Sequence, residues 1–176
     1  KNEVGGTFFL VGFWSEKYQD KIKEIDGAGL DIGTHSNTHP KMSTLSPASQ
    51  ESELMVSSKL ITNITGKPVR FFRPPYGDYN DQLLMTAEKL NLQTIQWDVD
   101  SLDWKGLTAE QILTRVKSGV KNGSIILFHN NSDHILEALP LVIEFLKSQG
   151  YSMVNLSGLV YENNYTIDNN GVQKRV

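Results

Sequence analysis

Two histidines, His35 and His39, lie four residues apart directly after the short apolar run Leu30–Thr34. Imidazoles with this spacing are typical ligands of a divalent metal. Asn37 and Thr38 between them offer hydrogen-bonding groups of the kind that orient a metal-bound imidazole. Neutral imidazoles suit zinc, cobalt, nickel or iron better than magnesium or calcium, and a catalytic site also needs a third ligand and an open position. Two exposed loop histidines are the simpler alternative.

A second polar segment, Arg73-Pro-Pro-Tyr-Gly77, ends a later apolar run. Consecutive prolines cannot lie within a central strand, so they predict a rigid loop. Arg73 would direct a permanent charge toward the strand ends, where a guanidinium can hold a carboxylate in a bidentate pair. The backbone N–H of Tyr76 is a possible oxyanion donor. The alternative is a tight turn with an arginine on the surface.

Three aspartates, Asp98, Asp100 and Asp103, cluster between two tryptophans, Trp97 and Trp104. Alternation along a strand would place Asp98 and Asp100 on one face. Acidic groups at the end of a buried strand are costly unless they are paired, so we expect a catalytic role for one of them rather than simple capping. Both tryptophans are most simply interpreted as packing residues, and stacking on a sugar is the alternative for Trp104.

A third histidine, His129, ends the apolar run Ser124–His129. It is either a core histidine with satisfied hydrogen bonds or a general acid, which a nearby carboxylate such as Asp100 would hold. His134 follows in a polar loop, where we expect it to be exposed to solvent.

Strands and helices that alternate along the chain must position these residues. Short runs rich in β-branched and aromatic residues predict strands at Thr7–Gly12, Leu30–Thr34, Val69–Arg73, Thr94–Val99, Ser124–His129 and Ser152–Leu156. Apolar residues at helical spacing predict helices at Ser15–Ala28, Ser46–Thr62, Asn80–Leu90, Ala109–Gly119 and Leu136–Gln149. This alternation predicts a parallel sheet, in either an open doubly wound sheet or an incomplete barrel.

Composition narrows the class of protein. The chain has 176 residues, of which 39% are hydrophobic, which suffices for one core. The net charge is −3 and the basic residues are scattered, so we expect no nucleic-acid partner. No apolar run approaches the roughly 20 residues of a transmembrane span. The absence of cysteine excludes a disulfide scaffold and a thiolate zinc site. We expect the chain to be part of a longer protein.

Taken in order, the two-histidine segment and the strings RPPYG, DSLDW and LFH resemble the polysaccharide deacetylases of carbohydrate esterase family 4, the NodB homology domains. The resemblance runs from about Thr7 to about Leu159 and is most similar to the peptidoglycan deacetylases of spore formers. It implies an α/β fold, the distorted (β/α)7 barrel of the NodB type, here lacking its first strand. The catalytic domain would comprise residues 1–160, and residues 161–176 would form a polar, loosely held C-terminal extension.

The same resemblance implies a hydrolase acting on an acetylated glycan. The reaction would be metal-dependent removal of N-acetyl groups from a polysaccharide that contains N-acetylglucosamine. Peptidoglycan is the expected substrate, acetylxylan and chitooligosaccharides are alternatives, and the location would be extracellular or in the cell envelope. His35 and His39 would be two of the three ligands of a divalent metal. We expect zinc, with cobalt, nickel or iron as alternatives.

The resemblance also implies a role for each of the other site residues. Arg73 would orient the catalytic base, and the Tyr76 N–H would donate to the oxyanion. Asp100 would hold and tune His129, the general acid. Two further residues would wall the acetyl pocket, namely Trp104 and Leu127.

Two departures from the family pattern affect these expectations. The first motif of the family, Thr-Phe-Asp-Asp, supplies the base and the third metal ligand, and it is absent here. We expect it upstream in the parent protein, or supplied by another chain. Asn130 follows His129 where many members have aspartate, which should alter the surroundings of His129 more than its role. The alternative function is a glycan-binding module without catalysis, on a degenerate deacetylase scaffold.

Overall fold

The structure, a computed structural model, describes residues 4–168 and 170–176. The chain divides into two compact units. The first comprises Lys1–Gln96 and Val154–Val176, and the second comprises Trp97–Met153. Among the described residues, no helix has the length and apolar character needed to cross a membrane.

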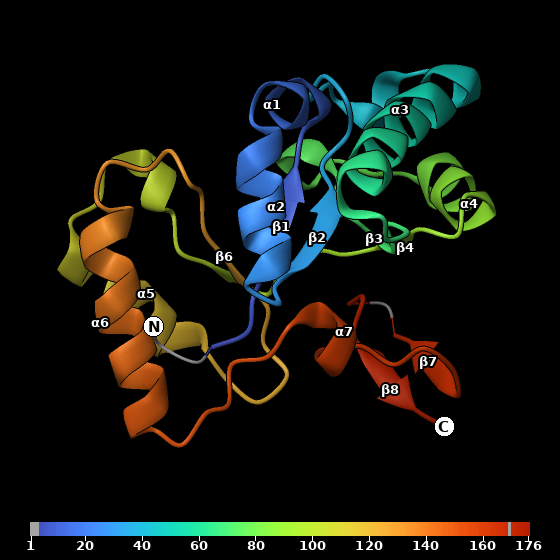
Figure 1. The fold of residues 1–176 in the computed structure, drawn as a ribbon. Helices are drawn as coiled ribbons and strands as arrows, with labels where there is room; N and C mark the ends of the chain where they lie inside the picture. The colour runs from blue at the N-terminus through green and yellow to red at the C-terminus, as the bar shows by residue number, and fades with distance from the viewer. Residues whose placement is uncertain (1–3, 169) are drawn as a thin grey trace. The chain divides into compact units, whose positions relative to one another are not determined.

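The first unit is built on a parallel sheet of four strands in the order β1-β2-β3-β4 (Figure 1). The strands are β1 (Thr7–Leu10), β2 (Asp31–Thr34), β3 (Phe71–Phe72) and β4 (Gln93–Thr94). Thr34 at the end of β2 lies opposite Phe72 at the end of β3. The residues that follow these two strands, His35 and Arg73, therefore start from neighbouring positions at one edge of the sheet.

The first unit also contains helices, most of which connect these strands. They are α1 (Gly12–Lys17), α2 (Gln19–Gly27), α3 (Pro47–Thr65), α4 (Asp81–Lys89) and α7 (Leu156–Leu159), with short 3-10 turns η1 (Met42–Thr44) and η2 (Pro75–Gly77). Local sequence sets their ends: the Ser46 side chain caps α3, and Gly66 ends it with a φ of 73°. Leu54 of α3 packs with Phe72 and Leu83, so this helix covers the sheet with its apolar side.

The second unit pairs two short parallel strands with two helices. Its elements are β5 (Val99–Asp100), β6 (Ile126–Leu127), the 3-10 turn η3 (Asp103–Lys105), α5 (Ala109–Gly119) and α6 (Ile135–Ser148). A capping box between Thr108 and Gln111 starts α5. Val116 of α5 and Val142 of α6 are buried against each other, so the two helices form one apolar core.

The expected α/β fold, with parallel strands and alternating helices, is confirmed, but several element predictions need correction. The helix expected at Ser15–Ala28 is two helices, because the chain leaves helical geometry at Tyr18, where φ is −121° and ψ is 47°. The strand expected at Thr94–Val99 is divided into β4 and β5. Its middle is interrupted where the Gln96 side chain donates to the carbonyl of Gly77 at 2.9 Å.

The strand expected at Ser152–Leu156 does not form. Its short apolar run is typical of a strand, but the segment is held by hydrogen bonds that involve side chains instead of a strand ladder. The Asn155 side chain accepts from the N–H of Gly6 and donates to the carbonyl of Gly29, each at 2.8 Å. The Leu156 N–H donates to the Thr7 hydroxyl at 3.1 Å. The segment therefore fastens the start of β1 and the turn before β2.

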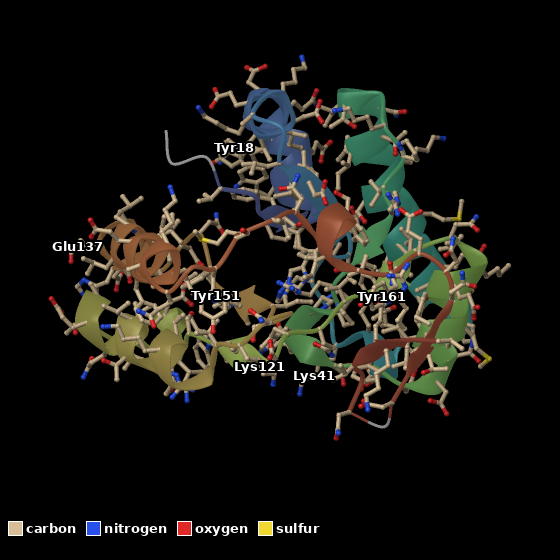
Figure 2. All side chains as sticks on the ribbon, turned by 90° about the horizontal axis from the view of Figure 1, so that it is seen from below. Tyr18, Lys41, Lys121, Glu137, Tyr151 and Tyr161 are labelled. Carbon is tan, nitrogen blue, oxygen red and sulfur yellow. The ribbon has the colours of Figure 1, made fainter. Side chains whose placement is uncertain are left out.

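The C-terminal segment contains an antiparallel hairpin, β7 (Tyr165–Ile167) and β8 (Gln173–Arg175), where a loosely held tail was expected. Tyr161 lies beside this hairpin (Figure 2), and its N–H donates to the Gln173 side chain at 2.8 Å. The division of the chain at residue 160 into a catalytic domain and an extension stays a prediction.

Candidate metal site and histidine–aspartate pair

The two histidines after β2 converge. Their Nε2 atoms are 3.2 Å apart, and the rings meet edge to face with centroids at 4.8 Å. The Nδ1 atom of His35 lies 2.7 Å from the backbone oxygen of Arg73. A carbonyl oxygen can only accept, so Nδ1 must carry the hydrogen and the lone pair of His35 lies on Nε2, the atom that faces His39.

This arrangement fits a metal ion of the zinc type. Two imidazole nitrogens, each about 2.0–2.1 Å from one zinc ion at a tetrahedral angle, are roughly 3.3–3.4 Å apart. The 3.2 Å separation between His35 and His39 is close to this range. In residues 4–168 and 170–176, however, no three histidine, cysteine, aspartate or glutamate side chains gather to hold an ion. Metal binding by this pair therefore stays a prediction, and the third ligand is not found in the part of the chain described.

The loop between the histidines has an unusual backbone. Ser36 and His39 adopt positive φ angles of 67° and 62°, a region that few residues other than glycine adopt. Ser36 is fully buried, and its hydroxyl accepts from the His39 N–H at 2.9 Å. Glu53 of α3 accepts from the N–H groups of Asn37 and Thr38. Sequence analysis missed Glu53, because no local spacing connects it with the loop that it contacts.

Arg73, predicted to orient a catalytic base, is 8% exposed. Burial lowers the pKa of Arg73 to about 10, so it keeps its positive charge at neutral pH. Its guanidinium lies 4.3 Å from the centroid of the Phe9 ring and donates to the carbonyl of Gln96 at 3.2 Å. The residue is thus a buried cation on an aromatic face, and its contact with a catalytic base stays a prediction.

The proline segment ends β3 and forms a turn, as expected, and the rigidity of this loop stays a prediction. Pro74 and Pro75 are buried, and the chain turns in η2 with Tyr76 at a φ of 60°. The Tyr76 ring is 65% exposed and meets the His39 ring edge to face, with centroids 4.7 Å apart. The loop therefore places Tyr76 beside the histidine pair, and oxyanion binding by its N–H stays a prediction.

In the second unit, His129 is held by Asp103. One carboxylate oxygen of Asp103 lies 2.8 Å from the His129 Nδ1 atom, and the other accepts from the His129 backbone N–H at 2.7 Å. The prediction that Asp100 holds His129 is therefore wrong. The Asp100 carboxylate instead accepts from the N–H of Leu102 at 2.9 Å, as a turn cap. Leu102 has a φ of 53°, and this left-handed residue turns the chain so that Asp103 can reach His129.

The electrostatics of Asp103 follow from its surroundings, since the residue is 1% exposed. Burial by itself would raise the pKa of Asp103. Hydrogen bonds from the His129 ring and backbone, with a smaller contribution from Ser101, outweigh burial and hold the pKa of Asp103 below its ordinary value. Asp103 is therefore a carboxylate at neutral pH, and the His129 ring must present Nδ1–H to it and keep Nε2 on its other side.

The remaining predicted residues have simpler surroundings. Asp98 accepts from the Ser124 hydroxyl at 2.9 Å and from the Ile125 N–H at 2.8 Å, so it supports the start of β6. Trp104 is 56% exposed, which is more than a packing residue needs. Leu127 is buried at the end of β6. Their roles in an acetyl pocket stay predictions.

Two other polar residues lie near His129 in sequence. Asn130, which stands where many family members have aspartate, is exposed. His134, expected to be exposed, has 40% of its side chain exposed, and its Nδ1 lies 3.6 Å from Glu137.

The predicted site residues fall into two groups, one in each unit. The first unit brings together His35, His39, Arg73 and Tyr76 at the ends of β2 and β3. The second unit carries Asp100, Trp104, Leu127 and His129, and adds Asp103, which sequence analysis did not choose. Each group is chemically coherent: one offers nitrogen donors for a metal, and the other offers an oriented imidazole.

Comparisons with known proteins connect both groups with one family. Residues 1–95 match the family described as polysaccharide deacetylase. A peptidoglycan-N-acetylglucosamine deacetylase of Bacillus cereus is 31% identical over 163 residues, which cover 90% of this chain and 59% of that protein. The deacetylase PgdA of Listeria monocytogenes is 32% identical over 162 residues, 92% of this chain but 34% of that protein. The chain thus spans only part of the length of these relatives.

Solved structures agree with this assignment. The Bc1960 peptidoglycan N-acetylglucosamine deacetylase has a TM-score of 0.87 at 31% identity, over 90% of this chain and 76% of that chain. The structure of BA3943, described as a family 4 pseudoenzyme from Bacillus anthracis, also has a TM-score of 0.87, at 36% identity over 91% of this chain and 57% of that one. The chain therefore belongs to the polysaccharide deacetylases of carbohydrate esterase family 4.

Proposed function

We propose that the protein carrying this chain removes N-acetyl groups by hydrolysis from a polysaccharide that contains N-acetylglucosamine. The observation that carries the proposal is the convergence of His35 and His39, with Nε2 atoms at 3.2 Å and the tautomer of His35 fixed by the Arg73 carbonyl. Such a pair is arranged to hold an ion, and the second unit offers an oriented imidazole for proton transfer. Peptidoglycan deacetylases among the relatives favour peptidoglycan as the substrate.

His35 and His39 would hold a divalent metal, with zinc as the expected ion, and such a metal supplies Lewis-acid activation of water and of the acetyl carbonyl. His129 delivers a proton from Nε2 to the departing amine, and Asp103 keeps the ring in the orientation that this transfer needs. The Tyr76 N–H donates to the developing oxyanion. Arg73 would orient the catalytic base. Trp104 and Leu127 line the acetyl pocket.

We also propose that the complete catalytic domain has more strands than the sheets described above. In that fold a distorted (β/α)7 barrel is closed by a strand that carries the base and the third metal ligand. This strand would come from the upstream part of the parent protein or from another chain. Because the expected substrate is a cell-wall polymer, the proposed location is extracellular or in the cell envelope.

A second candidate function is glycan binding without catalysis. It is favoured by the similarity to BA3943, a pseudoenzyme at 36% identity. A variant of that protein, described as having restored enzymatic activity, is 38% identical to this chain. The intact pair of His129 and Asp103 favours catalysis instead, because binding a glycan needs no oriented proton donor.

The test has two parts. Zinc titration by calorimetry should show binding to this chain that is lost in His35→Ala, while His134→Ala, at a histidine outside the pair, should bind as well as wild type. Acetate release should then be measured with the parent protein on acetylated peptidoglycan, chitooligosaccharide and xylan. Zinc binding without acetate release would support the glycan-binding alternative, and zinc binding that survives His35→Ala would contradict the metal site.

A further inference from the structure

The loop that joins the two histidines has backbone groups that no strand satisfies. It begins after β2, so the N–H groups of Asn37 and Thr38 have no ladder partner. Both donate to one carboxylate oxygen of Glu53 at 2.8 Å, and the Thr38 hydroxyl donates to the other oxygen at 2.7 Å. A carboxylate that receives two successive N–H groups is a strong, directional acceptor. Glu53 therefore fixes the middle of the loop.

The carbonyl groups of the same loop are satisfied from its other side. The N–H of Gly12 donates to the Ser36 carbonyl at 3.0 Å, and the N–H of Phe13 donates to the Asn37 carbonyl at 3.3 Å. These donors belong to the first turn of α1, whose N–H groups have no partner within the helix. The loop is thus clamped between the start of α1 and the side chain of Glu53.

The position of Glu53 is itself set by β2. One helical turn further along α3, the buried Ser57 hydroxyl forms a short hydrogen bond with the hydroxyl of Thr34, the last residue of β2. This bond fixes the register of α3 against the strand that ends at His35. Residues one turn apart lie on the same face of a helix, so Glu53 must face the segment that follows His35.

We propose that Glu53 is a positioning residue of the metal site, which holds the loop in the conformation that makes the two imidazoles converge. The loop needs such a restraint, because Ser36 and His39 both adopt positive φ angles, which are unfavourable for these residues. Without it the backbone can relax and His39 can turn away from His35. The inference deepens the proposed function, since it rests on metal binding by this pair.

The decisive variant is Glu53→Gln. It keeps the size of the side chain but replaces the negative carboxylate by a neutral amide with one acceptor oxygen, so the hydrogen bonds from the two N–H groups lose their charge assistance. The matched control is Glu51→Gln on the same helix, because the Glu51 carboxylate pairs with Lys89 at 3.1 Å. Three quantities should be measured on the whole chain: the zinc dissociation constant, amide hydrogen exchange by NMR, and the melting temperature without metal.

Glu53→Gln should weaken zinc binding about 10–100-fold, the usual effect of losing a group that supports metal ligands. Amide exchange should become faster at Asn37 and Thr38, while the rest of the first unit keeps its protection. Glu51→Gln should change neither quantity. If Glu53→Gln does not fold, Thr38→Val removes one of the three hydrogen bonds and should show a smaller loss of affinity in the same direction.

The outcomes separate this inference from the proposed function. Zinc binding by wild type that Glu53→Gln and Thr38→Val leave unchanged would overturn the role of Glu53 alone. A loss of protection spread over the whole unit, with a matching fall in melting temperature, would make Glu53 a general structural residue and would also overturn the inference. No zinc binding by wild type would overturn both the metal site and the role assigned to Glu53.

Discussion

Replacing Asp103 by asparagine should disable proton transfer by His129 while leaving the fold in place. Asp103 accepts from both the ring and the backbone of His129, at 2.8 and 2.7 Å. Asparagine has one acceptor oxygen, so its NH2 group must face one of these two donors. If the asparagine oxygen still accepts from the His129 backbone N–H, its NH2 group faces the Nδ1–H of the ring. Two donors then face each other, so the ring must either turn or move its hydrogen to Nε2.

The magnitude follows from these two bonds. A hydrogen bond to a charged group contributes about 1.5–3 kcal/mol. Asp103 is 1% exposed, so solvent screens the interaction little. We expect Asp103→Asn to lose one such bond and to lower the free energy of unfolding by an amount in that range. A misplaced general acid should lower kcat by about 10²–10⁴, with KM almost unchanged, because the proton is transferred only in the transition state.

Two assays test this prediction. Acetate release by the parent protein gives kcat, and nitrogen NMR of the imidazole reports which ring nitrogen carries the hydrogen in this chain. Asp100→Asn is the control, since the Asp100 carboxylate caps Leu102 and has no described bond to His129. It should keep kcat within a few-fold of wild type. The reasoning fails if Asp100→Asn is as damaging as Asp103→Asn, or if Asp103→Asn keeps near-normal kcat and the wild-type tautomer.

Two further predictions concern stability. Because the pKa of Asp103 is held below the ordinary value of an aspartate, 3.8, the unfolded chain binds this proton more readily than the folded chain. The contribution of Asp103 to stability is therefore present above about pH 4 and is lost as the pH falls through its lower folded pKa. The urea midpoint of unfolding should fall between pH 5 and pH 2, and it should fall less steeply in Asp103→Asn. Gly12→Ala should cost about 1–3 kcal/mol in urea unfolding through overpacking, because a Cβ there would lie 1.9 Å from Asn37 Oδ1, whereas Gly27→Ala meets nothing within 4 Å. A Gly12→Ala chain as stable as wild type would contradict the close packing of α1 on the loop.

The success of the fold predictions depended on how local the signals were. Helix α5 has the bounds expected for it, Ala109–Gly119, because its capping residue and apolar spacing are both within the segment. Strands depend on partners elsewhere in the chain, so β3 is only Phe71–Phe72 where Val69–Arg73 was expected. The short apolar run at Ser152–Leu156 predicted a strand, but no described strand pairs with this segment. Sequence spacing shows which residues can form a strand, but it does not show whether another strand is available to pair with them.

The same distinction explains the site. His35 and His39 are close in sequence, so their convergence could be anticipated. The resemblance to the family assigned the partner of His129 to Asp100, but Leu102, beyond the end of β5, turns the chain with a positive φ and brings Asp103 to His129 instead. Glu53 contacts the loop only because α3 is fixed in register on β2, which is a tertiary relation. Contacts of this kind leave no periodic signal in the sequence.

Hydrogen bonds hold the segment Asn155–Ser157 against β1 and β2. These bonds affect the order in which the chain can fold. The bonds to Gly6 and Thr7 join residues 149 positions apart, and the bond from Ser157 to Asp31 spans 126 positions. Contacts of such high sequence separation form late, because a long loop must close before they contribute. During synthesis on a ribosome the second unit, which is continuous in sequence, can complete its own contacts first. The first unit, with its histidine pair, gains its last fastening only after residue 157 has emerged.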